Sequence, residues 1–514
     1  MKKGFCLLLT ILVIGAILRL YNLSVWQYFS YDQARDFLII KKILLEGKFT
    51  LIGPSLGIAD GAYLPPFYYY LTAPFLLLSR FHLWGPDFFS VLIGLGGVIV
   101  FYLLAKEMFG KKPAFLASLF YTLNPYMIQA SRHIRNPHLQ PLFLLLFAFY
   151  VLKFLENKKV FFLYFSTIFL AISVSLHITA IVFLPVLVYL FFIQLKRKSS
   201  LSILISVMIF FLFFAPLLVF DLRHGFGVSK AVVSFFAEKG GSDLRNKVFR
   251  FLIFFCKIPV ILFSGNFQKE LLSLRSFPIL SLEQINLFKL PVLESVKLFL
   301  SLVVWMFVLV FSFRGLKDKR IEVRNKFKLI LILIFLGFCI SFLLPQNYSY
   351  LYYFYNLFPF IFLLFSGCFF LFFEKIKNKI FLALFLFLAV ISFFPNGLKT
   401  EIRPEKYFLP SAKIIAQDFS SNDKVAVAAN INESNRWEKN GIEYRYFLES
   451  LYELPFLGSK ENDYKNANVL YLIDEGDLKE PLKMGGMEME TFRPAKIEKV
   501  WEVETGQKIY KMTK

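Results

Sequence analysis

Long apolar runs alternate with short basic stretches along most of this chain, and this alternation constrains its fold more than any other feature. Hydrophobic residues make up 57% of the 514 residues, which is more than a water-soluble core requires. Several runs approach the roughly 20 residues that a helix needs to cross the hydrocarbon core of a bilayer. The sequence therefore predicts an all-α polytopic membrane protein.

The basic stretches predict how the chain is threaded through the membrane. Five of them separate the apolar runs: "KEMFGKKP", "ENKK", "QLKRKSS", "RGLKDKRIEVRNKFK" and "EKIKNK". Because Lys and Arg gather in cytoplasmic loops, we place these connections and the N-terminus inside the cell. The same bias makes the apolar segment at 65–80 an interfacial or re-entrant helix, and leaves 249–265 at the membrane surface or dipping into it.

This threading predicts about 11–13 transmembrane helices in the plasma membrane and an external C-terminus. The firm runs lie near residues 4–20, 88–105, 113–129, 139–155, 160–176, 178–195, 201–220, 294–313, 328–344, 351–373 and 379–395.

The net charge of +22 raises the alternative of a nucleic-acid partner. The placement of Lys and Arg in short loops favours membrane lipids as partners instead, with no nucleic acid. The four cysteines, Cys6, Cys256, Cys339 and Cys368, all lie in apolar segments. Their spacing indicates neither a disulfide framework nor a zinc site.

The composition becomes polar and charged after Pro395. Strand-like runs at 424–431, 468–474 and 496–503 accompany helix-like runs at 411–419 and 441–452. We predict a small external α/β domain here. The expected domains are residues 1–397, a transmembrane domain with outer loops 21–87, 130–138 and 221–293, and residues 398–514, the external soluble domain.

The first outer loop carries two carboxylates in "SYDQARD", namely Asp32 and Asp36. Asp32 begins an amphipathic helical pattern, so it is either a helix cap or a group with a chemical role. A general base is one such role, and the two uses of one carboxylate are compatible. Asp36 lies four residues further along the same helical face, where Arg35 can pair with it.

The second outer loop, "NPYMIQASRHIRNPHLQP", is cationic without any acid. It contains Arg132, His133, Arg135 and His138. Short outer loops normally avoid Arg, so this cluster indicates an anionic partner such as a lipid phosphate, or attraction to headgroups. His177, at another outer turn, either lines the same face or is a satisfied histidine at a helix end.

Two further outer stretches contribute candidates. "FDLRHGFG" places Asp221, Arg223 and His224 directly after an apolar run. "PQNYSYLYYFYNLFP" contains Tyr352 and Tyr353, which fit an interfacial aromatic belt or rings that stack on sugars. The outer loops therefore place acids together with Arg and His at one face, as a mixed-charge site would require.

Four pieces of the chain, in order, resemble a known family: "SYDQARD", "AYLPPFYYYL", "LAKEMFGKKPAFLASLFYTLNPYMIQASRHIRNP" and "YYFYNLFPF". The pattern resembles the GT-C fold glycosyltransferases of the protein O-mannosyltransferase type, including the bacterial lipid A aminoarabinose transferases. The resemblance covers the first ~150 residues in motifs and the rest by topology. It implies a transferase that takes a sugar from a polyprenyl-phosphate donor and gives it to an envelope acceptor at the outer face.

The resemblance assigns the acidic position of the first outer loop to Asp32, as the general base of a single inverting displacement. Where the family commonly has Glu next and a second acid in the following outer loop, this chain has Gln33 and Asn136. Leu64 stands where a Lys often precedes the Pro-Pro pair, which leaves Arg132, Arg135 and Arg223 to hold phosphate. The expected substrate- and lipid-phosphate-binding residues are Asp36, Arg132, Arg135, Asn136, His138, Arg223, His224, Tyr63, Tyr352 and Tyr353.

Two other functions stay open alongside the enzyme. A transporter or flippase of a lipid-linked sugar would need polar residues inside the spans, and the apolar runs hold few. A non-catalytic envelope assembly protein would use the outer loops only to bind lipid. No cofactor is certain, and Gln33 and Asn136 leave the binding of a divalent metal open.

Overall fold

The computed structural model describes residues 2–56, 61–239, 292–343, 351–375, 403–431, 438–476 and 478–514, with scattered positions between 245 and 262. The chain divides into two compact units. Unit 1 consists of Met1–Tyr21, Thr50–Tyr68 and Asp87–Thr400. Unit 2 consists of Asn22–Phe49, Tyr69–Pro86 and Glu401–Lys514.

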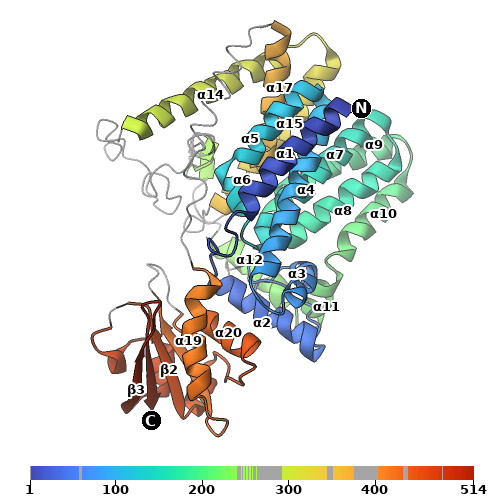
Figure 1. The fold of residues 1–514 in the computed structure, drawn as a ribbon. Coiled ribbons are helices and arrows are strands. Elements are labelled where there is room, and N and C mark those ends of the chain that lie inside the picture. Colours follow the sequence, from blue (N-terminus) through green and yellow to red (C-terminus); the bar gives the residue numbers. More distant parts are fainter. Residues whose placement is uncertain are drawn as a thin grey trace. The chain divides into compact units, whose positions relative to one another are not determined.

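Unit 1 is helical and contains the apolar runs. Its helix α5 packs against α1 and α17, and α8 packs against α7 and α10 (Figure 1). Phenylalanine and leucine side chains fill the space between the helices, as in the stacked pair of Phe101 and Tyr121, whose ring centroids are 4.8 Å apart. The elements are α1 (Lys2–Leu20), α4 (Trp84–Phe109), α5 (Lys111–Leu123), α6 (Pro125–Ala130), η1 (Asn136–Leu139), α7 (Gln140–Asn157), α8 (Val160–Leu176), η2 (Ile178–Phe183), α9 (Leu184–Lys196), α10 (Ser200–Leu212), α11 (Ala215–Arg223), α12 (Gly227–Lys239), α14 (Val292–Leu316), α15 (Ile321–Phe338), α16 (Ile340–Leu343), η6 (Leu351–Phe354) and α17 (Phe358–Lys375).

The predicted multi-pass membrane protein is confirmed. Among the described residues, four helical stretches are long and apolar enough to span a bilayer: Trp84–Phe109, Asn136–Asn157, Ile178–Lys196 and Ile321–Phe342. The pair Ser200–Leu212 and Ala215–Arg223 would make a fifth, and shorter apolar helices accompany them. The total of 11–13 spans stays a prediction, because the run at 379–395 and most of the loop at 221–293 lie outside the described residues.

Two runs that the sequence predicts as continuous helices, 113–129 and 201–220, are broken. In the first, Asn124 caps a new helix by accepting hydrogen bonds from two backbone N–H groups, each at 3.2 Å, and Pro125 begins that helix without an N–H of its own. In the second, α10 and α11 meet at 64° just before Pro216, which has no N–H to donate to the preceding turn and whose ring clashes with a carbonyl there.

Unit 2 combines a four-stranded sheet with helices (Figure 1). The strand order is β1-β2-β4-β3, with β1 and β2 parallel and the other neighbours antiparallel. The predicted α/β fold of the C-terminal region is confirmed, and β4 is the strand that the sequence prediction lacked. The elements are α2 (Tyr31–Glu46), most of α3 (Phe67–Leu78), α19 (Glu405–Asp418), β1 (Val425–Asn430), α20 (Ile442–Leu451), α21 (Glu461–Asn466), β2 (Val469–Asp474), η7 (Pro481–Lys483), α22 (Met487–Phe492), β3 (Lys496–Glu502) and β4 (Lys508–Thr513).

The structure groups part of the first outer loop differently from the predicted domains. Helix α2 packs on α20, so residues 22–49 and 69–86 belong to the same compact unit as the C-terminal sheet. The physical cause is an aromatic cluster: the ring of Phe29 lies 5.3 Å from those of Tyr446 and Phe447, and Phe37 lies 5.7 Å from Tyr446. At 12 residues, α3 is too short to span a bilayer as a single helix.

Candidate functional site

Helix α2 carries the two candidate carboxylates in unit 2. Its N-cap is Ser30, whose backbone N–H donates to the Gln33 side chain at 3.1 Å in a capping box, and it ends at Gly47 in the left-handed conformation. The alternative that Asp32 merely caps this helix is therefore wrong. Asp32 lies in the first turn, where the helix dipole favours a negative charge.

Arg35 joins the two carboxylates. Its guanidinium lies 3.0 Å from Asp32 and 2.9 Å from Asp36, so the predicted pairing of Arg35 with Asp36 is present. Asp36 also accepts a hydrogen bond from the Tyr69 hydroxyl at 3.0 Å. The side chain of Asp32 is 65% exposed and that of Asp36 only 5%. Burial raises the pKa of Asp36 to about 6, although Arg35 opposes the rise. Asp32 is thus the accessible carboxylate, and Asp36 anchors the arginine beside it.

The other candidates lie in unit 1. Residues 131–139, which we call the cationic loop, connect α6 to α7. Arg132 is buried, and it donates to the carbonyl of Leu18 at 3.0 Å. Burial lowers the pKa of Arg132 to about 10, while the nearby Asp87 raises it, so the group is charged at neutral pH. Asp87 also accepts the backbone N–H of Ile134 at 3.3 Å. Arg132 therefore faces the protein interior rather than a solvated surface.

The structure brings Arg135, His138 and Tyr352 together. The guanidinium of Arg135 lies 5.9 Å from the centroid of the Tyr352 ring, and the rings of His138 and Tyr352 are 6.4 Å apart. His138 Nδ1 donates to the carbonyl of His133 at 2.7 Å, because a carbonyl can only accept. This hydrogen bond fixes the orientation of the imidazole and places a proton on Nδ1.

A polar cluster lies where α8 ends and α7 begins. Asn136 donates to the carbonyl of Leu176 at 2.7 Å, and Gln140 donates to that of His177 at 2.7 Å. The His177 ring stacks on Tyr353 at 4.9 Å, and its Nδ1 lies 3.0 Å from the Thr179 hydroxyl. Non-helical backbone inside an apolar bundle needs such partners. His177 is thus the satisfied histidine at a helix end, with its ring against one of the candidate tyrosines.

A third group surrounds α11. The rings of Tyr63 and Phe220 are 6.5 Å apart, and His224 stacks on Phe220 at 4.0 Å. Arg223 is exposed. Asp221, in contrast, accepts the backbone N–H of Val228 at 2.7 Å and so caps α12, which is a structural role. Tyr63 and His224 thus lie beside the ring of Phe220, whereas the carboxylate of Asp221 is occupied by its hydrogen bonds to α12.

Gln33 and Asn136, the two amides that stand where the resemblance expects acids, are engaged within the protein. Gln33 is held in the capping box, and Asn136 turns its donor nitrogen toward a carbonyl. Within the described part of the chain, no three His, Cys, Asp or Glu side chains form a group that could hold a metal ion.

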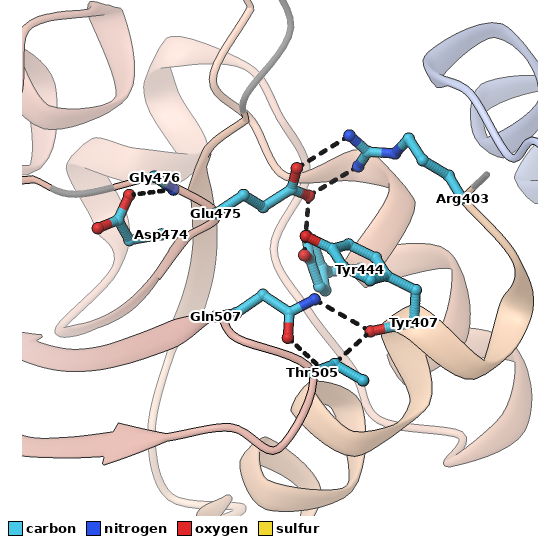
Figure 2. A network of polar contacts seen from close by, with 8 residues as sticks. All are labelled: Arg403, Tyr407, Tyr444, Asp474, Glu475, Gly476, Thr505 and Gln507. Carbon is cyan, nitrogen blue, oxygen red and sulfur yellow. Dashed lines mark hydrogen bonds and ion pairs between the residues drawn. The ribbon is translucent and has the colours of Figure 1, made fainter. Parts of the chain in front are cut away.

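A buried network in unit 2 was not anticipated from the sequence (Figure 2). Glu475, directly after β2, receives two hydrogen bonds from Arg403, at 2.7 and 2.9 Å, and one from the Tyr444 hydroxyl at 2.8 Å. The side chains of Gln507 and Thr505 donate to the backbone carbonyl of Tyr407, as the dashed lines in Figure 2 show. The sequence feature that could have indicated this network is the acidic residue directly after the strand, at the carboxyl end of a parallel strand.

Arg19 is a second functional candidate that the sequence reasoning missed. It lies in the last turn of α1 and is 1% exposed. An arginine inside an apolar run is itself a signal, because such residues are costly and mark functional positions in membrane proteins.

Comparison with known proteins places this geometry in context. Residues 64–220 match the model of the dolichyl-phosphate-mannose-protein mannosyltransferase family. The fold is similar to that of the oligosaccharyltransferase of Archaeoglobus fulgidus, with a TM-score of 0.52 and 13% identity over 91% of this chain and 67% of that one. The chain has the GT-C fold. The predicted resemblance to GT-C membrane glycosyltransferases is thereby confirmed.

ArnT from Cupriavidus metallidurans, solved with undecaprenyl phosphate and in the apo state, also aligns with this GT-C chain. The TM-score is 0.47 in both states, with 12% identity over 99% of this chain and 98% of ArnT. No curated protein matches the chain.

Proposed function

We propose that this protein transfers a sugar from a polyprenyl-phosphate donor to an envelope acceptor at the outer face of the membrane. The GT-C fold and the family match over residues 64–220 support a membrane glycosyltransferase. The matched family is named for a dolichyl-phosphate sugar, which supports a lipid-linked donor. The short basic connections support a cytoplasmic N-terminus and an external C-terminal domain.

The observation that carries the mechanism is the contrast between Asp32 and Asp36. A general base must be accessible, and the Asp32 side chain is 65% exposed while Asp36 is buried. Arg35 holds both carboxylates, so the orientation of Asp32 is fixed by a guanidinium that is itself anchored on Asp36 and is only 25% exposed. Asp36 thus serves as a positioning residue.

The proposed reaction is a single displacement. The acceptor hydroxyl oxygen bonds to the anomeric carbon as its proton passes to Asp32, and the bond from that carbon to the phosphate oxygen breaks. The polyprenyl phosphate leaves with the electron pair, and the anomeric configuration inverts. Polyprenyl phosphate needs no protonation to leave when cations stabilise it, so one base suffices.

The cationic loop supplies candidates for the phosphate and the sugar. Arg135 and His138 lie beside Tyr352, which combines a bidentate phosphate donor with a ring that stacks on a sugar. Arg223, which is exposed, is a further candidate for the phosphate. Tyr353 is held by the His177 ring.

The test is sugar transfer from a panel of labelled polyprenyl-phosphate sugars, in lipid nanodiscs, with envelope extract as acceptor. Asp32→Asn should lose at least ~100-fold in turnover, the scale of removing a general base. Glu46→Gln is the matched control, because Glu46 is also an exposed carboxylate on α2 with a basic partner, Lys48. It should stay within about twofold of the wild type.

Unchanged turnover in Asp32→Asn would refute Asp32 as the base. Absence of transfer from every donor by folded wild-type protein would refute the proposed activity. The transporter and assembly alternatives would then replace it.

A further inference from the structure

Arg19 ties three separate segments of unit 1 together. Its Nε donates to the Ser131 hydroxyl at 2.9 Å. Its Nη1 donates to the carbonyl of Thr122, in the last turn of α5, at 3.2 Å and to that of Gly15, in α1, at 3.3 Å. Ser131 is the first residue of the cationic loop, so the guanidinium connects that loop directly to two helices.

The environment of Arg19 is costly for a charge. The residue is 1% exposed, and among the described residues no carboxylate lies within ion-pair distance of it. The carbonyls it contacts lie near the C-terminal ends of α1 and α5, where the helix dipoles offset part of its charge. Desolvating a guanidinium costs several kcal/mol even so, which an apolar side chain here would avoid. The arginine must therefore supply something that a leucine cannot.

The packing leaves Ser131 little freedom beside this guanidinium. Gly94 of α4 faces it, and a Cβ added to Gly94 would lie 2.3 Å from the Ser131 Cβ and 3.4 Å from Arg19 Nε. Arg19, Ser131 and His138 also line one small cavity. His138 thus borders the same space as the group that holds the start of its loop.

The next residues of the loop are held in the same way. Arg132 donates to the carbonyl of Leu18, adjacent to Arg19, and the backbone of Ile134 donates to Asp87 of α4. These two contacts, like that between Arg19 and Ser131, involve loop residues that precede Arg135 and His138. The loop is therefore fixed on its α6 side before the residues that face Tyr352.

We propose that Arg19 is a positioning residue for the cationic loop: by holding Ser131 it preorganises Arg135 and His138 to receive a phosphate group. A binding surface that is fixed in advance loses less conformational entropy when its ligand arrives. The identity of that phosphate as the polyprenyl-phosphate donor rests on the proposed function. The proposal that Arg19 fixes the loop does not depend on that function.

The kinetic test compares Arg19→Lys and Ser131→Ala with the wild type. Lys keeps the charge, but its donors all lie on one nitrogen and cannot reproduce the separated Nε and Nη1 contacts of Arg19. Ser131→Ala removes the link to the loop while Arg19 stays. We expect the KM for the donor to rise about tenfold in both, with kcat lowered by less than about threefold, because binding rather than chemistry is affected. Ser166→Ala, which removes a buried hydroxyl of α8 that donates to the Leu163 carbonyl, is the control.

A second measurement keeps the proposal testable without activity. Hydrogen exchange of the peptide containing residues 131–139, in nanodiscs, should be about tenfold faster in both variants, with exchange in α8 unchanged. Unchanged exchange in the loop, or a fall in kcat with KM constant, would overturn the positioning role. Faster exchange in a protein whose wild type transfers no sugar would support the positioning role and refute the proposed function alone.

Discussion

The buried ion pair in unit 2 allows a quantitative prediction. Glu475→Gln keeps the shape of the side chain and an acceptor for Tyr444, but it removes the charge that faces Arg403 (Figure 2). The side chains of Glu475 and Arg403 are 2% and 11% exposed, so water cannot replace the lost partner. The buried guanidinium would lose the carboxylate that pairs with it directly and keep only the weaker influence of Glu443.

The expected magnitude follows from this geometry. Breaking a buried pair by removing one partner typically costs about 3–5 kcal/mol. The neutral amide of Gln retains part of the hydrogen bonding, so we expect a loss near the lower end, about 3 kcal/mol. Replacing both partners, in Arg403→Met with Glu475→Met, removes both desolvation costs, and this double variant should be less destabilised than Glu475→Gln.

Pulse proteolysis of the full-length protein in nanodiscs, across a urea series, measures the opening of unit 2. Lys499→Met is the control, because Lys499 is 56% exposed where it pairs with Asp418, and surface pairs contribute about 0–1 kcal/mol. The reasoning would be refuted if Glu475→Gln were no more destabilising than the control. It would also be refuted if the double variant were the least stable of the set.

Two further predictions concern single residues. Asp36 binds its proton more tightly in the folded protein, with a pKa of about 6, than at its ordinary value of 3.8. Stability should therefore fall as the pH rises between these values, by at most about 3 kcal/mol, and Asp36→Asn should flatten that slope in urea unfolding followed from pH 4 to pH 7. Gly94→Ala should displace Ser131 and cost about 1–3 kcal/mol by overpacking, and a thermal unfolding midpoint unchanged from the wild type would contradict the close approach.

The fold class was predictable from the sequence because it depends on patterns that span many residues. Apolar runs predict the helices of unit 1, and strand-like runs of residues predict three of the four strands of unit 2. The strand at Lys508–Thr513 was missed because its pattern is short and charged. The helix breaks depend on single residues: Asn124 and Pro125 interrupt an apolar run whose hydropathy continues through them.

The sequence was enough to predict which residue types form the candidate site, but not which residues each of them contacts. The sequence indicates that Asp32, Asp36 and the arginines matter, yet it does not distinguish the exposed carboxylate from the buried one. That difference arises from Tyr69 and from the packing of α2, which are distant in sequence from the motif. Arg132 shows the same limit, because its burial against the end of α1 follows from a contact across more than a hundred residues.

The packing of α2 on α20 has a consequence for the order in which the protein matures. The segment that carries Asp32 leaves the ribosome early, whereas the aromatic residues Tyr446 and Phe447 that cover its apolar face are synthesised about 400 residues later. Until then Phe29 and Phe37 lack that partner, and a chain truncated before Glu401 would keep the motif without its support. We therefore expect the carboxylate segment to reach its final packing, and the proposed activity to arise, only after the C-terminal domain has been synthesised and has folded against it.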